Sequence, residues 1–72
     1  STLFKREEGM SFIAYVTNVR MERAAQLLLE SDDSVAQIAR TVGYESQSKF
    51  TSEFKKAFSM LPTEYRRLHK QA

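Results

Sequence analysis

The chain has 72 residues, of which 11 are Lys or Arg and nine are Asp or Glu, and it contains no cysteine. A chain of this length builds one small hydrophobic core and offers no room for an enzyme cleft. We therefore expect neither an enzyme nor a disulfide framework and, with His69 as the single histidine, no metal site and no cofactor. No apolar run approaches the roughly 20 residues that span a bilayer, so no membrane contact is expected.

Glycine and proline are scarce and apolar residues recur at helical spacing, so an all-α fold is predicted. Residues 1–8 have the pattern of a helix end, which Gly9 closes as the residue just past the last turn. Ser11 is the predicted N-cap of a long helix from Phe12 to about Glu30. The apolar residues of this helix cover more than one face, so it needs packing partners on two sides.

Residues 34–58 have the pattern of a helix-turn-helix, the feature of this sequence that points to DNA binding. Ser34 and Gln37 have the S-x-x-Q spacing of a capping box, which predicts a helix start at Ser34. The apolar residues that follow share one helix face: Val35, Ile38, Ala39 and Val42. Gly43 stands where the chain must leave this helix, and a positive φ angle at that point costs glycine little.

The second helix of the motif is predicted to start at Ser46, just after Tyr44, which covers the turn. Three phenylalanines at helical spacing, Phe50, Phe54 and Phe58, form one buried stripe. Glu53 lies outside that stripe and is expected to be solvated. The polar side chains on the remaining faces are available to DNA: Gln47, Ser48, Lys49, Thr51, Ser52 and Lys55.

The carboxyl third of the chain is basic, since six Lys or Arg stand against two Glu from Lys49 onwards. Any one of these charges is also ordinary on a solvated helix face, so the charge alone does not establish nucleic-acid binding. A last short helix is predicted from Pro62 to about Lys70, with Pro62 at its first position and Glu64 at its third. Leu61, just before it, has no side-chain oxygen to cap this helix.

These patterns together resemble the carboxyl-terminal DNA-binding domain of the AraC/XylS family of bacterial transcription regulators. The resemblance covers nearly the whole chain and rests on these residues: Arg20-Met-x-x-Ala24-x-x-x-Leu28, Val35-x-x-Ile38-Ala39, Gly43-Tyr44, Phe50, Phe54-Lys-Lys-x-Phe58 and Pro62-x-Glu64-Tyr65-Arg66. Two positions depart from the family pattern, which typically has glycine at the position of Ser59 and threonine or serine at that of Leu61. Both departures concern the stability of the last turns more than the function.

The family domain has two helix-turn-helix units joined by a linker helix, so the resemblance also implies a domain organisation. Within a single domain of residues 1–72, it makes 1–10 the end of the first recognition helix, 11–30 the linker helix, 34–58 a complete second unit and 62–70 the terminal helix. It further implies an amino-terminally truncated first unit, which leaves four apolar residues partly uncovered: Leu3, Phe4, Phe12 and Tyr15.

The resemblance assigns the DNA contacts residue by residue. The positions that resemble base-contacting sites are Gln47, Ser48, Lys49, Thr51 and Ser52, and those suited to phosphate are Lys5, Arg6, Ser46, Lys55 and Lys56. Ser1 and Thr2 resemble exposed positions of the first recognition helix. A glutamine suits a bidentate contact with adenine, and a threonine methyl can meet the methyl group of thymine, whereas lysines on phosphate fix register without reading sequence.

The expected partner is double-stranded DNA, bound sequence-specifically by a cytoplasmic regulator. The resemblance also implies contact with RNA polymerase and a homodimer formed through a separate amino-terminal domain. Asp32 and Asp33 are candidates for contact with a partner such as polymerase, but a plain polar loop is the interpretation that we favour for them. The alternative function is a helical protein-interaction module that binds polymerase or another regulator. Salt dependence separates the two, because phosphate contacts make affinity fall steeply with ionic strength.

Overall fold

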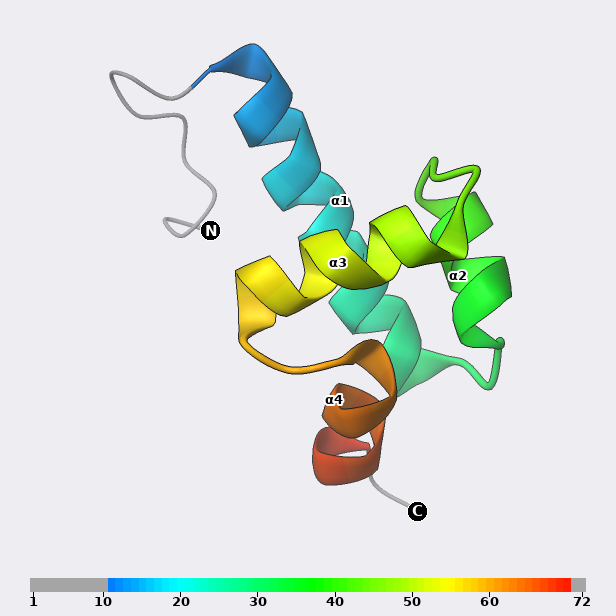
Figure 1. Ribbon diagram of the computed structural model, residues 1–72. Coiled ribbons are helices and arrows are strands. Elements are labelled where there is room, and N and C mark those ends of the chain that lie inside the picture. Colours follow the sequence, from blue (N-terminus) through cyan, green and yellow to red (C-terminus); the bar gives the residue numbers. More distant parts are fainter. Residues whose placement is uncertain (1–10, 71–72) are drawn as a thin grey trace.

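A computed structural model describes residues 11–70, and over this range the predicted all-α fold is confirmed (Figure 1). The helices are α1 (Phe12–Glu30), α2 (Val35–Thr41), α3 (Gln47–Phe58) and α4 (Pro62–His69). In Figure 1, α3 crosses in front of the long helix α1, with α2 on one side and α4 below. The helix end predicted for residues 1–8 and the four predicted contacts at Ser1, Thr2, Lys5 and Arg6 lie outside the described residues.

Helix α1 begins and ends on serine side chains. The Ser11 hydroxyl accepts a hydrogen bond from the backbone N–H of Ala14 at 3.0 Å, which confirms it as the N-cap. At the other end, the Ser31 hydroxyl donates to the Leu27 carbonyl at 2.8 Å and accepts from the N–H of Asp33 at 3.2 Å. These bonds satisfy orphan backbone groups of the helix ends and turn the chain towards α2.

The hydrophobic core lies where α1, α2 and α3 meet. Its buried residues are Met21, Ala24, Ala25, Leu28, Ile38, Ala39, Val42, Phe50 and Phe54. Alanines at 24, 25 and 39 let the helix backbones approach closely, while Phe50 and Phe54 fill the space between them. An aromatic cluster extends this core to α4, because Tyr65 contacts Phe54 and Phe58 with ring centroids 5.6 and 5.3 Å apart.

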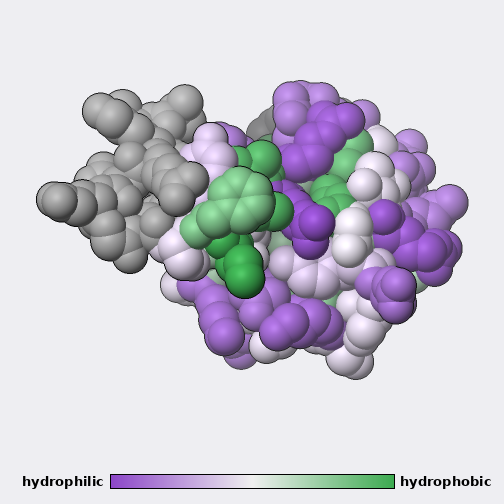
Figure 2. Space-filling model, turned by 90° about the horizontal axis from the view of Figure 1, so that it is seen from above, coloured by the Kyte–Doolittle hydropathy of each residue, from purple (hydrophilic) through white to green (hydrophobic). Residues whose placement is uncertain are grey.

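The two halves of α1 differ in burial. Its carboxyl half supplies four core residues, whereas Ile13 near its start is 76% exposed and Val19 is also exposed. Figure 2 shows apolar side chains gathered at one side of the upper face, with mostly hydrophilic side chains over the rest of it. Helix α1 packs against α2, α3 and α4, and these helices leave Phe12, Ile13 and Val19 of its first half exposed. None of the four helices has the length and hydrophobicity of a membrane-spanning segment.

The turn between α2 and α3 has the predicted geometry. The capping box at the start of α2 is complete, with Gln37 N–H donating to Ser34 Oγ at 3.1 Å and Ser34 N–H donating to Gln37 Oε1 at 3.2 Å. Gly43 has a φ angle of +103°, as expected for the residue at which the chain leaves a helix. Tyr44 packs edge-on against Phe50, with centroids 5.8 Å apart, and so ties the turn to α3.

The connection from α3 to α4 carries both departures from the family pattern. Ser59 adopts a left-handed conformation with a φ angle of 63°, which glycine would adopt at lower cost. Leu61 precedes α4 in an extended N-cap conformation, and its side chain caps nothing. Only half of a capping box forms, because Glu64 Oε1 accepts from the Leu61 N–H at 2.9 Å.

Two basic side chains of the carboxyl third clamp the end of α4 to the end of α1. Arg66 donates to the carbonyls of Leu28 and Ser31 at 3.0 and 3.1 Å. Lys70 donates to the Ser31 carbonyl at 2.6 Å and pairs with the Asp32 carboxylate at 2.5 Å. The cations satisfy carbonyls at the negative end of α1, which is where a helix favours positive charge. Two of the six basic residues thus hold the end of α4 against the end of α1.

Candidate nucleic-acid interface

Helix α3 is held rigidly on one side and exposed on the other. Phe50 and Phe54 are fully buried, and these residues fix the rotation of the helix about its axis. At its start, the Ser46 hydroxyl accepts from the Lys49 N–H at 3.2 Å, so the predicted helix start at Ser46 is confirmed. This hydroxyl keeps its own proton as a donor for a phosphate oxygen. Because Phe50 and Phe54 face the core, the side chains on the opposite side of α3 face solvent.

The side chains predicted to contact bases lie along the first two turns of α3. Gln47, Ser48, Lys49 and Ser52 are exposed, and Thr51 is half-buried. At 100° per residue, Ser48 and Ser52 lie on the face opposite Phe50 and Phe54, since residues four apart are neighbours on a helix surface. The structure thus brings these side chains together in a short polar surface next to the turn.

The two lysines of α3 predicted to contact phosphate have different surroundings. Lys55 and Lys56 are both exposed and occupy the last turns of the helix. Lys55 makes no ion pair with any described residue, whereas Lys56 Nζ lies 3.6 Å from Glu53 Oε2. The two exposed lysines therefore differ in pairing, because Lys56 has an ion-pair partner on the same helix and Lys55 has none among the described residues.

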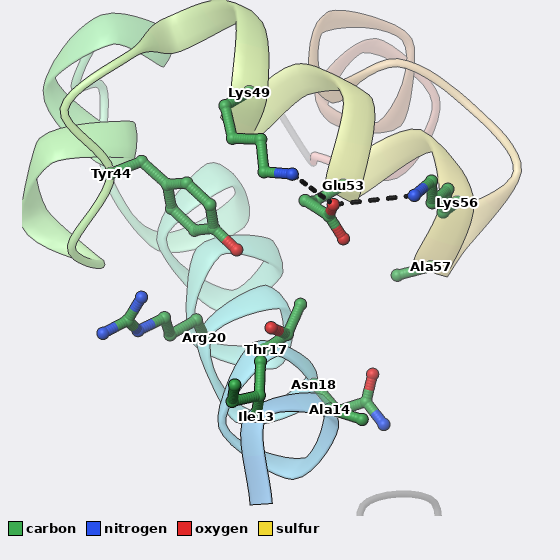
Figure 3. A pocket seen from close by; sticks show the side chains of 10 residues that line it. All are labelled: Ile13, Ala14, Thr17, Asn18, Arg20, Tyr44, Lys49, Glu53, Lys56 and Ala57. Atoms are coloured by element: carbon green, nitrogen blue, oxygen red, sulfur yellow. Dashed lines mark ion pairs between the residues drawn. The ribbon is translucent and has the colours of Figure 1, made fainter. Parts of the chain in front are cut away.

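The expectation that Glu53 is solvated was wrong. Its side chain is only 17% exposed, and its Oε2 oxygen also pairs with Lys49 Nζ at 3.2 Å. Glu53 lines the groove between α1 and α3 together with Thr17 and Asn18 of α1. Figure 3 shows the two lysines converging on this carboxylate. The i, i+4 and i, i+3 spacings from Lys49 and to Lys56 were the sequence signal for these pairs.

The groove beside Glu53 has a volume of about 550 Å³ and a mixed polar lining. Its α1 side includes Thr17, Asn18 and Arg20, and Tyr44 closes one end. The Arg20 guanidinium lies 5.7 Å from the centroid of the Tyr44 ring, within the range of a cation–π contact. Arg20 also borders Gly43, where an added Cβ would lie 3.2 Å from its Cζ. Sequence reasoning gave Arg20 no role beyond the family resemblance.

His69, which the sequence left without a role, packs against Tyr65 with the two rings tilted by 47° and their centroids 4.7 Å apart. In the loop after α1, the pKa of the Asp32 carboxylate is lowered, chiefly because Lys70 donates a hydrogen bond to it and secondarily because of the charge of Lys70. Asp33, the other candidate for a polymerase contact, is exposed in the same loop. The basic carboxyl third is therefore partly a structural clamp around the end of α1.

A capped first helix, a glycine turn and a second helix with one buried and one polar face define a helix-turn-helix DNA-binding domain. Comparison with known proteins gives the same class. A family model described as a helix-turn-helix domain matches residues 1–68. The chain belongs to the AraC-type helix-turn-helix family and is a DNA-binding domain of that class of transcription regulators.

Relatives with curated names are transcription regulators. The chain is 44% identical over 64 residues to the transcriptional activator RhaR of Mannheimia succiniciproducens, a match that covers 89% of this chain and 23% of that protein. It is 36% identical over 69 residues to the melibiose operon regulatory protein of Escherichia coli K12, covering 96% of this chain and 23% of the relative. The chain thus spans less than a quarter of the length of these relatives.

Solved structures share the fold at substantial identity. The carboxyl-terminal domain of AraT, a response regulator from Geobacillus stearothermophilus, superimposes with a TM-score of 0.87 at 43% identity, covering 100% of this chain and 60% of that one. The carboxyl-terminal domain of the response regulator yesN from Fusobacterium nucleatum gives a TM-score of 0.79 at 38% identity, covering 92% and 64%.

Proposed function

We propose that α3 reads DNA sequence in the major groove through the exposed side chains of its first two turns. Gln47, Ser48, Lys49, Thr51 and Ser52 contact base edges in this proposal. Lys5, Arg6, Ser46, Lys55 and Lys56 contact phosphates, and Ser1 and Thr2 add contacts from the first unit. The observation that carries the proposal is the division of α3 into a buried aromatic stripe and an opposite polar surface. The major groove admits one α-helix, and this surface has donors and acceptors for its edges.

Sequence-specific binding is tested by site selection followed by titration at several salt concentrations. We expect the selected duplex to bind more tightly than a random duplex, and both affinities to fall with salt as counterions are released. Equal affinity for the two duplexes would contradict base readout. Failure to bind either duplex, at low salt, would contradict DNA binding by this chain and favour the alternative, a helical module that binds polymerase or another regulator.

We further propose that the whole regulator works on DNA in the bacterial cytoplasm as a homodimer and contacts RNA polymerase. The acidic loop after α1 supports the polymerase contact, because Asp33 is exposed there and the pairing of Asp32 with Lys70 fixes the course of the loop. In transcription assays with purified polymerase, Asp33→Ala should lower activation at unchanged promoter occupancy. Unchanged activation would remove this loop from the proposal, and sedimentation of the whole regulator tests the dimer.

A further inference from the structure

Glu53 is the one acidic residue of α3, and it stands among the lysines that the proposed function places on DNA. Both ammonium groups pair with the same oxygen, Oε2, at 3.2 Å from Lys49 and 3.6 Å from Lys56. On the helix surface Glu53 lies on the α1 side, whereas Ser48 and Ser52 lie on the outer face. The ion pairs therefore draw both lysines towards the groove between α1 and α3 (Figure 3).

The burial of the three side chains is unequal. The lysine side chains are 65% and 72% exposed, but the carboxylate side chain is 17% exposed. The side chain of Glu53 is therefore the least exposed of the three, and both lysines share its carboxylate. A single exposed ion pair is weak. The partly buried carboxylate nevertheless attracts both lysines, and it competes for them with any other anion that approaches.

We propose that Glu53 is an electrostatic restraint on DNA affinity, an inference that rests on the proposed function. Lys49 and Lys56 must leave its carboxylate before they reach a phosphate or a base edge. Through Lys56, Glu53 therefore weakens binding to every duplex and lowers the number of counterions released, and through Lys49 it weakens binding to the selected duplex further. The remaining base-contacting side chains, Gln47, Ser48, Thr51 and Ser52, set the sequence preference without this restraint.

The test is Glu53→Gln, which keeps the shape of the side chain and removes its charge. Through the release of Lys56, the variant should bind both the selected and the random duplex about fivefold to tenfold more tightly near 0.1 M salt, with a further gain on the selected duplex through the release of Lys49. Its plot of log affinity against log salt should steepen by about 0.9 for each lysine that reaches a phosphate. Glu22→Gln is the matched control. It removes the same charge on the surface of α1 formed by Val19, Glu22, Arg23 and Gln26, away from the groove that contains Glu53.

A variant that lacks both lysines distinguishes two effects of Glu53→Gln: the release of Lys49 and Lys56, and the removal of a negative charge near DNA. In the Lys49→Ala/Lys56→Ala protein, Glu53→Gln should change affinity by no more than about twofold and leave the salt slope unchanged. An equal gain with and without the lysines would overturn the inference. So would weaker binding by Glu53→Gln, which would mean that the carboxylate positions the lysines for DNA.

The wild-type titration keeps the two proposals distinguishable. If the wild-type chain binds DNA but Glu53→Gln matches it in affinity and slope, the restraint is overturned and the proposed function stands. If the wild-type chain binds neither duplex, both proposals are overturned. Circular dichroism melts of each variant confirm that the proteins compared are folded.

Discussion

Gln47 occupies the first turn of α3, with its side chain exposed beside the inter-helix turn. An amide that bonds two atoms of one base is worth about 1 to 3 kcal/mol of discrimination. Gln47→Ala should therefore weaken binding to the selected duplex by that amount, leave random duplex unaffected, and relax preference at one base pair. Competitive titration with the two duplexes measures the difference. Equal losses on both duplexes would contradict direct readout by Gln47.

Lys55 supplies the contrasting case, because it is exposed on α3 and makes no ion pair with the described residues. In the proposed function it contacts phosphate, which every sequence shares. Lys55→Ala should weaken binding to selected and random duplexes alike and reduce the salt slope by about 0.9. A loss confined to the selected duplex would instead make Lys55 a base-contacting residue.

At the scale of the element, the start of α4 depends on Leu61. Its backbone has the extended conformation of an N-cap, yet the side chain offers no acceptor. Leu61 is half-buried and is not among the partly buried side chains that pack against the core. Leu61→Thr should stabilise the domain by about 0.5 to 2 kcal/mol, the usual worth of an N-cap.

Urea melts of the two proteins measure this effect, with base preference expected to stay the same. A lower midpoint for Leu61→Thr at unchanged m-value would show that Leu61 acts as a hydrophobic plug near Phe58 and Tyr65. Leu61→Val serves as the control, because it shortens the side chain without adding an oxygen. The comparison thus separates capping from packing at one residue.

At the scale of the whole molecule, the Arg66 clamp joins residues 35 or more positions apart. Its removal leaves the carbonyls of Leu28 and Ser31 without these donors in a partly buried site. Arg66→Ala should destabilise the domain by about 1 to 3 kcal/mol, as expected when hydrogen bonds from a charged group are lost. Arg67→Ala, at the exposed neighbouring residue, should change stability little. Similar losses from both variants in thermal melts would contradict the clamp.

The Asp32–Lys70 pair makes part of the stability depend on pH. The pKa of Asp32 is lowered from its ordinary value of 3.8, so the unfolded chain takes up the proton first as pH falls. The contribution of this pair is present above pH 3.8 and is lost as pH falls through the lower pKa of the folded state. The Tm difference between wild type and Asp32→Asn should shrink accordingly in acid. Asp33→Asn is the control, and an identical pH course for both variants would contradict the assignment to Lys70.

The sequence by itself determined the helices, because their signals are local. Capping residues at Ser11, Ser34 and Ser46, the glycine of the turn and the phenylalanine spacing act over one or two helical turns. The same periodicity also placed Phe50 and Phe54 in the core and thereby oriented the polar face of α3. Residues at helical spacing share a face wherever the helix packs, so this part of the candidate interface followed from the chain alone.

Only the tertiary structure decided which charges are available to a partner. Glu53 is only 17% exposed in the groove between α1 and α3, and Arg66 and Lys70 reach carbonyls that lie more than 30 residues earlier. A charged side chain is long and flexible, and its partner depends on which helix ends and grooves come within reach after packing. The six basic residues from Lys49 onwards therefore divide, in the folded domain, into the clamp of Arg66 and Lys70, the two lysines paired with Glu53, and the exposed Lys55 and Arg67.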